Sequence, residues 1–367
     1  MNRFILVLLV ALALAQNAAL AAAAERKRTP ELVIYDNDWS VSTGGKGYVS
    51  QPALAILLAD PNFRILGLTS VSGDYWRDEG VASLLRFLEL IGAPGVPVHN
   101  GAVLPLVNSA ARHADWEARF GKAYWSGAWN DAERDPFAHA QGPWMIIPPR
   151  EGMPTLKPAT QNAVSFLIEA VHRHPGAVTI YAEGPLTNIA LALRQDPAFA
   201  SLVRRIIIQG SSVGAAHEGA DKRAEFNFQF DPEAADIVLT APWREAVLLG
   251  DISNRTELTP ALLARMARID TPAGRYATAN ASPGLPLWSQ LGAAIIVDPA
   301  IVREAVPAVV AVSLDHGAEY GRTRSWPAGH AQAPALGQRA VSIVTQVDSA
   351  RLADLYVESL SRPIRRR

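Results

Sequence analysis

The sequence predicts an α/β fold with an open, mostly parallel sheet and helices on both of its faces, and two observations lead to this prediction. Short apolar and β-branched runs alternate with helix-like segments along most of the chain, which is the order of a parallel sheet with crossover helices. Several of these runs end abruptly in polar residues. In open α/β sheets the ligand lies beyond the carboxyl ends of the strands, so these polar ends indicate a binding crevice.

The first predicted strand carries the acids on which the functional interpretation depends. Its apolar run, residues 32–35, fits a strand buried on both faces and ends in Asp36, Asn37 and Asp38. Two carboxylates at a buried strand end are costly unless they hold a positive group, such as a metal ion. The alternative is that they cap the next helix or close a turn, as Asp and Asn often do.

The remaining elements follow in the order of a doubly wound sheet, with three antiparallel strands expected near the C-terminus. A loop rich in glycine and serine, residues 39–50, follows the first strand, and its Lys46 lacks the Ser or Thr of a phosphate-binding Walker pattern. The strands are expected at 65–71, 96–99, 178–182, 205–209, 246–249, 308–314, 321–326 and 340–346, and the helices at 52–59, 80–91, 162–172, 189–194, 232–239, 287–297 and 352–360.

The composition is that of an ordinary globular protein and excludes several classes of function. The chain has 367 residues, of which 49% are hydrophobic and 19% charged, with a formal net charge of −1. This balance gives no electrostatic footprint for nucleic acid or for an anionic membrane. The absence of cysteine excludes disulfides, thiolate metal sites and cysteine nucleophiles.

The N-terminal residues have the pattern of a secretory signal peptide. Residues 1–24 combine an early Arg3, an apolar run and a tail of alanines that resembles a cleavage site. We expect cleavage near Ala24 and export, most simply to a bacterial periplasm; an uncleaved anchor is the alternative. Residues 25–30 are then a charged linker and 31–361 a single domain.

The region between residues 105 and 158 loses the alternating pattern and is expected to be a long excursion over the site or over a partner surface. It contains four tryptophans, which either stack on a base or sugar or form a satellite hydrophobic cluster. Residues 362–367 form a basic tail that we interpret as a solvated terminus.

Taken together in order and spacing, several motifs resemble the inosine-uridine-preferring nucleoside hydrolase family from about residue 32 to 326. The matching pieces are Asp36-Asn37-Asp38 with the 53–59 helix, 71–74, Gly184-Pro185-Leu186-Thr187-Asn188, Glu225-Phe226-Asn227-Phe228 with Asp231-Pro232-Glu233-Ala234, and 287–299. The resemblance implies a Rossmann-like sheet, cleavage of the N-glycosidic bond of ribonucleosides, and a calcium ion at the strand ends.

The resemblance also assigns roles to single residues of this chain. Asp38 matches the acid that ligates the metal and takes a proton from water, Asp36 its neighbour at the rim of the metal site, and the main-chain carbonyl of Thr187 another metal ligand. These carboxylate and carbonyl oxygens suit hydrolysis of a nucleoside, because a hard cation with oxygen ligands can bind a water and a sugar diol at once.

Three further residues match the groups that hold the sugar. Glu225 and Asn227 match the residues that bind the ribose hydroxyls, and Asp74 stands where the family usually has an Asn that contacts the sugar. Cleavage of a ribosyl C–N bond passes through an oxocarbenium-like state, which needs nearby negative charge and an activated water.

The departures from the family pattern fall on the expected metal ligands. A pair of aspartates before the first helix is replaced by Gln51 and Pro52, and a His-Asp pair near the C-terminus by Trp288 and Ser289. Because calcium prefers six to eight oxygen ligands, we expect weak or absent metal binding. Lys46 is a second hypothesis, since its ammonium could neutralise the acids of the first strand where a cation once did.

Three functions remain open at this point. The first is an exported N-glycosyl hydrolase, the second a non-catalytic or metal-independent pseudoenzyme that binds a sugar or nucleoside, and the third a periplasmic solute-binding protein, for which the two similar lobes are missing. The expected partner is a small nucleoside or sugar-like ligand. A second copy of the chain is an open alternative, while nucleic acid and, after signal cleavage, a membrane are not expected partners.

Overall fold

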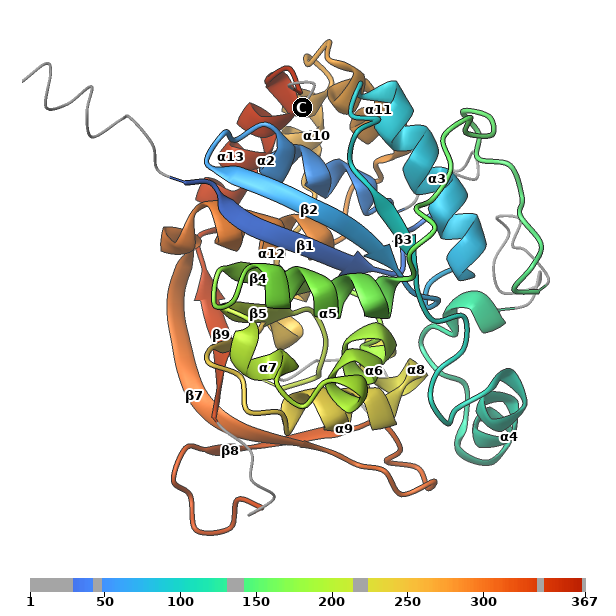
Figure 1. The fold of residues 1–367 in the computed structure, drawn as a ribbon, viewed down its shortest axis with the longest axis vertical. Coiled ribbons are helices and arrows are strands. Elements are labelled where there is room, and N and C mark those ends of the chain that lie inside the picture. The colour runs from blue at the N-terminus through green and yellow to red at the C-terminus, as the bar shows by residue number, and fades with distance from the viewer. Residues whose placement is uncertain (1–28, 42–47, 131–141, 214–223, 335–339, 365–367) are drawn as a thin grey trace, which may run out of the picture.

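The sheet at the centre of the computed structural model contains nine strands in the order β3-β2-β1-β4-β5-β6-β9-β7-β8 (Figure 1). The structure describes residues 29–41, 48–130, 142–213, 224–334 and 340–364. The predicted signal peptide and Lys46 lie outside these ranges. The strands are β1 (Glu31–Asn37), β2 (Phe63–Ser70), β3 (Val98–Asn100), β4 (Val178–Ala182), β5 (Arg205–Ile208), β6 (Ala246–Leu248), β7 (Val302–Val312), β8 (Thr323–Pro327) and β9 (Val341–Val347).

The predicted α/β class is confirmed, with one change at the C-terminal edge of the sheet. The first seven strands in this order, from β3 at the edge to β9, are each parallel to their neighbours. Strand β7 is antiparallel to both β9 and β8. The last expected strand is therefore parallel to β6 on one side and antiparallel to β7 on the other, so it extends the main sheet.

Strand β1 is buried on both faces, as its apolar run predicts. Val33 and Tyr35 belong to the core cluster on one face, whereas Leu32 and Ile34 belong to the cluster on the other. This alternation follows from the period of two residues in a strand. The acids that end the run are consequently carried into the interior together with the strand.

Helices cover both faces of the sheet (Figure 1). One core cluster contains apolar residues of α2, α3, α10, α11, α12 and α13, and the other those of α5, α6, α7 and α9. The helices are α2 (Leu54–Leu58), α3 (Arg77–Leu90), α4 (Ala110–Phe120), α5 (Ala163–Arg173), α6 (Thr187–Gln195), α7 (Phe199–Leu202), α8 (Phe226–Phe230), α9 (Pro232–Leu239), α10 (Pro260–Met266), α11 (Pro272–Asn280), α12 (Trp288–Val297) and α13 (Ser349–Ser361).

Two helices, α10 and α11, lie in a segment for which the sequence analysis predicted no element. Each begins with a proline after a threonine whose side chain accepts a hydrogen bond from the helix backbone, Thr259 for α10 and Thr271 for α11. These are ordinary helix start signals. No helix in the described ranges is both long and apolar enough to cross a membrane.

The tryptophan-rich excursion contains α4 and a single 3-10 turn, Gly127–Trp129, in its described part. Trp129 packs with Trp76 and Ala128 in a small satellite cluster and stacks on Phe230 of α8 with ring centroids 4.2 Å apart. Trp144, by contrast, is 73% exposed. The satellite-cluster interpretation therefore holds for Trp129 and not for Trp144.

Candidate active site

Asp38 lies immediately after β1 and is almost completely buried. Its Oδ2 accepts a hydrogen bond from the backbone N–H of Asp74, with an N–O distance of 2.7 Å. Two glycines make room for this carboxylate, because a Cβ at Gly73 would overlap Asp38 Oδ2 and a Cβ at Gly184 would come within 2.9 Å of Asp38 Oδ1. The ends of β1, β2 and β4 thus meet around a single acid.

Burial raises the pKa of Asp38 well above its usual range, and the negative charges of Asp74 and Glu183 raise it further. Burial likewise raises the pKa of Asp74 to about 6, opposed by a hydrogen bond from Trp125. Within the described residues none of these three acids forms a salt bridge. The crevice therefore disfavours further negative charge and favours a positive one.

Trp125 links the excursion to this crevice, since its indole Nε1–H donates to Asp74 Oδ1 at 2.7 Å. We expect Trp125→Phe to weaken binding of a nucleoside about fivefold, because a hydrogen bond to a charged group contributes on the order of 1 kcal/mol and here orients Asp74. The measurement is the Kd by calorimetry. Trp144→Phe, at an exposed tryptophan of the same excursion, is the control and should leave the Kd unchanged. Equal Kd values for the two variants would contradict the assignment.

Asp36 lies within β1, two residues before Asp38, and has different hydrogen-bond partners. Its Oδ1 accepts hydrogen bonds from the Thr69 hydroxyl and from Asn188 Nδ2, the latter at 2.7 Å. Its Oδ2 is buried and has no hydrogen-bond partner in the described part of the chain. Burial raises its pKa to about 6. In that same part of the chain neither Asp36 nor Asp38 caps a helix, so the alternative interpretation of these acids as helix caps is not the arrangement found.

Thr187 is the first residue of α6, next to the end of β4. Its hydroxyl donates to Asp231 Oδ2 at 2.6 Å, and Asp231 in turn caps α9. This contact ties the start of α6 to the start of α9. The role of its main-chain carbonyl as a metal ligand stays a prediction.

Asn227 is brought to the same sheet edge by the short helix α8. Its Nδ2 donates to two backbone carbonyls, those of Glu183 at 3.0 Å and Gln209 at 3.1 Å. Both donor hydrogens are used, which leaves Oδ1 as the acceptor for a ligand hydroxyl. The side chain thus bridges the ends of β4 and β5, and the Glu183 N–H connects this point to β1 by donating to the Asp36 carbonyl at 2.9 Å.

Glu225 is the N-cap of α8, where the sequence analysis predicted no helix. Its Oε1 accepts from the N–H of Asn227 at 3.1 Å, and its Oε2 from the N–H groups of Phe228 at 3.2 Å and Ser211 at 3.1 Å. These hydrogen bonds hold α8, and with it Asn227, against the end of β5. Direct contact with a ribose hydroxyl stays a prediction.

The burial of Glu225 predicts a pH dependence of stability, because burial raises its pKa to about 7 against three opposing backbone hydrogen bonds. For an acid whose pKa is raised by folding, the stabilisation is complete below the pKa of the unfolded chain and is lost as the pH rises through the folded value. Between pH 4.5 and 7.5 we expect a loss of about 3 kcal/mol from this residue.

The measurement is the free energy of unfolding in urea at several pH values. At pH 4.5 the Glu225→Gln variant should be less stable than wild type, because one amide oxygen replaces two acceptor oxygens. Between pH 4.5 and 7.5 it should lose less free energy of unfolding than wild type does. Glu358→Gln, at an exposed glutamate of α13, should keep the wild-type slope. A Glu225→Gln slope equal to that of wild type would contradict this account.

Glu183 is the acid of the crevice that the sequence analysis missed. It directly follows β4, as Asp38 follows β1, and only 5% of its surface is exposed. Its carboxylate accepts hydrogen bonds from the hydroxyls of Tyr35, Tyr48 and Ser289, that of Tyr48 at 3.1 Å. Burial raises its pKa to about 8 against these three hydrogen bonds. The sequence feature that could have identified Glu183 was its position between a buried strand and Gly184.

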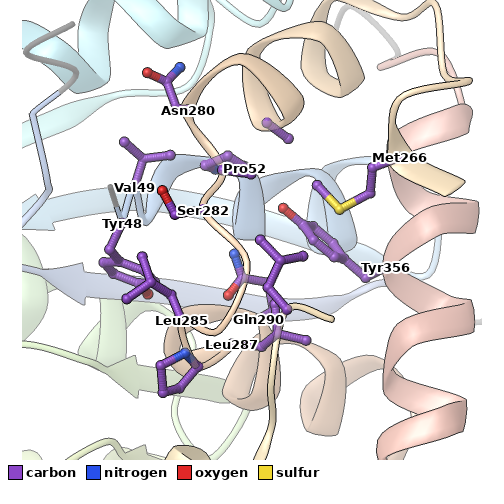
Figure 2. A pocket seen from close by; sticks show the side chains of 14 residues that line it. Tyr48, Val49, Pro52, Met266, Asn280, Ser282, Leu285, Leu287, Gln290 and Tyr356 are labelled. Carbon is purple, nitrogen blue, oxygen red and sulfur yellow. The ribbon is translucent and has the colours of Figure 1, made fainter. Parts of the chain in front are cut away.

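A small cavity lies behind Tyr48, on the side of α11 and α12, with a volume of about 30 Å³. Figure 2 shows Tyr48 at its edge together with Val49, Pro52 and Gln290. This volume holds about one water molecule and is too small for a nucleoside. None of the crevice acids lines it, so it is separate from the site described above.

A sequence model of the inosine-uridine preferring nucleoside hydrolase family matches residues 33–354. This chain belongs to that family. The resemblance inferred from the motifs is confirmed, and the matched range includes every residue of the crevice.

Named relatives and solved structures of nucleoside hydrolases agree with this membership. Uridine nucleosidase 1 of Arabidopsis thaliana is 36% identical over 193 residues, 52% of this chain and 50% of that protein. The inosine-uridine preferring nucleoside hydrolase of Crithidia fasciculata is 29% identical over 230 residues, 61% of this chain and 64% of that protein. The match thus spans about half to two thirds of these relatives. A plant nucleoside hydrolase structure covers 91% of this chain and is itself fully covered, with 25% identity and a TM-score of 0.71.

Nucleoside hydrolases are typically calcium-dependent, so the donor set of this chain is relevant. Among the described residues no three His, Asp or Glu side chains converge so as to hold a metal ion. Asp36 offers one unpartnered buried oxygen, while Asp38 Oδ2 and the Glu183 carboxylate already accept hydrogen bonds. This set falls short of the six to eight oxygens that calcium prefers. The residues described do not fit a calcium cage.

Proposed function

We propose that this chain is an N-glycosyl hydrolase that cleaves the bond between the sugar and the base of a ribonucleoside or a similar glycoside. The observation that supports the proposal is a row of polar groups after neighbouring strands in a member of this family: Asp38 contacts Asp74 after β1 and β2, and Asn227 binds the carbonyls that follow β4 and β5. Such an edge is where an open α/β sheet binds its ligand.

The chemistry assigns a task to each group. Water adds its oxygen to the anomeric carbon while the bonding electron pair leaves with the base nitrogen, and Asp38 takes the proton of the water as general base. In their ionised form the acids of the crevice stabilise the positive charge that develops on the sugar. Asn227 Oδ1 and Asp74 accept hydrogen bonds from the sugar hydroxyls, which fixes the sugar relative to Asp38.

The test is release of free base and reducing sugar from a panel of purine and pyrimidine nucleosides, with and without calcium. Release from at least one nucleoside above the rate of the Asp38→Asn variant supports the proposal. Absence of release from the whole panel, with measurable nucleoside binding, would instead establish the second candidate, a binding pseudoenzyme. That candidate is favoured by the replacement of acids at Pro52 and Ser289.

Export is a separate part of the proposal and is supported by residues 1–24 alone, with their early Arg3, apolar run and terminal alanines. Expression of the full chain in a Gram-negative bacterium should give a periplasmic protein that begins near Glu25. Mass spectrometry of the purified protein measures this directly. An intact Met1 in the membrane fraction would establish the uncleaved anchor.

A further inference from the structure

The cluster around Glu183 joins three segments that lie far apart in the sequence. Tyr35 comes from β1, Glu183 follows β4, and Ser289 is the second residue of α12. The Tyr48 hydroxyl reaches the same carboxylate from the end of the loop after β1 and also accepts the backbone N–H of Ser289 at 2.9 Å. Four side chains therefore meet at one buried point.

The position of this cluster is informative because Ser289 stands where the family pattern has an acidic metal ligand. In this chain the side chain at 289 is a hydroxyl that donates to Glu183. The carboxylate at this point of the crevice thus comes from the end of β4 instead of from the start of α12.

Three hydroxyl hydrogen bonds oppose the effect of burial on Glu183, but burial still raises its pKa to about 8. A carboxylate has about four lone-pair sites, and the hydroxyls of Tyr35, Tyr48 and Ser289 occupy three of them. The three hydroxyls give this buried acid hydrogen-bond partners from β1, from the loop after β1 and from α12, so its polar oxygens are satisfied without a cation. A neighbouring tyrosine extends the cluster, since the Tyr181 hydroxyl donates to the Ser289 carbonyl at 3.2 Å.

We propose that the Glu183 cluster replaces calcium as the element that holds β1, β4 and α12 together, so that this chain keeps its crevice without a bound metal ion. A calcium ion in this family would connect the end of β1, the start of α6 and the start of α12, and the cluster connects the same part of the fold. The proposal rests on the proposed function only for the location of the crevice, and its test requires no substrate.

The first experiment measures metal content and thermal stability of the full chain. After dialysis without chelator, elemental analysis should find fewer than about 0.1 calcium ions per chain. The Tm should agree within about 1 °C between EDTA and millimolar calcium, because a ligand that does not bind the folded state does not stabilise it. Retention of about one calcium per chain, or a rise of several degrees with calcium, would overturn the proposal.

The second experiment compares two glutamates that both accept tyrosine hydroxyls. Glu183→Gln should lower the Tm by about 5 °C in EDTA and in calcium alike, since it disturbs three buried hydrogen bonds. Glu233→Gln is the matched control, because Glu233 accepts the Tyr320 hydroxyl at 2.9 Å on α9, outside the cluster. We expect a smaller shift for this control.

A milder variant keeps the comparison informative where Glu183→Gln fails to fold. Tyr48→Phe removes one donor of the cluster and leaves the carboxylate in place; it should lower the Tm by a few degrees without any response to calcium. Shifts for both cluster variants no larger than that of Glu233→Gln, or recovery of their Tm by calcium, would show that the cluster does not hold these segments together. Loss of hydrolysis alone would leave this result unaffected.

Discussion

Asp38→Asn is expected to reduce nucleoside hydrolysis by roughly 10³-fold while the protein remains folded. The amide cannot take a proton from water, so the general base is lost. Its oxygen can still accept the backbone N–H of Asp74 that the carboxylate accepts at 2.7 Å, so the local structure is kept. The measurement is the initial rate of base release together with the Tm of the same preparation.

Asp196→Asn is a suitable control for this variant. Asp196 also accepts a backbone N–H, that of Ala198 at 2.9 Å, but lies at the end of α6 away from the crevice. It should retain the wild-type rate. Unaltered turnover in Asp38→Asn would remove Asp38 as the catalytic base, and equal losses in both variants would indicate a general effect on folding.

Gly73→Ala is expected to abolish measurable activity and to lower stability by about 2 kcal/mol. The new methyl group would overlap Asp38 Oδ2 and lie 2.7 Å from Pro185 Cδ, so the acid or the turn after β4 must move. Displacement of a catalytic group by about 1 Å is enough for a large loss of rate. The measurements are the rate of base release and the free energy of unfolding in urea.

Gly317→Ala provides the control, because a Cβ at Gly317 has open space around it. Its activity and stability should stay within error of wild type. If Gly73→Ala instead retained full activity, the carboxylate of Asp38 would not need its present position, and the assignment of the site at the ends of β1 and β2 would be wrong.

The acids at the two strand ends differ in how far the sequence could predict them. Asp36 and Asp38 follow an apolar run, and burial of that run on both faces was enough to place them at the sheet edge. Glu183 follows an equally apolar strand, but none of the motifs that matched the family gives it a role. Its importance appears only when Tyr35, Tyr48 and Ser289 are seen to converge on it, from positions up to 148 residues away along the chain.

Glu225 shows the opposite case, a residue identified by motif whose local task only the structure shows. The motif was consistent with contact to a ribose hydroxyl, whereas the carboxylate caps α8 through three backbone N–H groups. The five residues of α8 are too few for a helix period to be recognised, so no sequence pattern indicated a cap there. The cap in turn fixes Asn227 against the ends of β4 and β5, and its contact with a ribose hydroxyl stays a prediction.

By itself the sequence determined the α/β class, the positions of most strands along the chain and the family, because hydrophobic periodicity and short motifs are local properties of the sequence. Only the tertiary structure decided which of the described polar groups lie together at the strand ends and which hydrogen bonds they form. Hydrogen bonds between distant elements depend on how the strand ends are brought together in space. No local pattern records that arrangement.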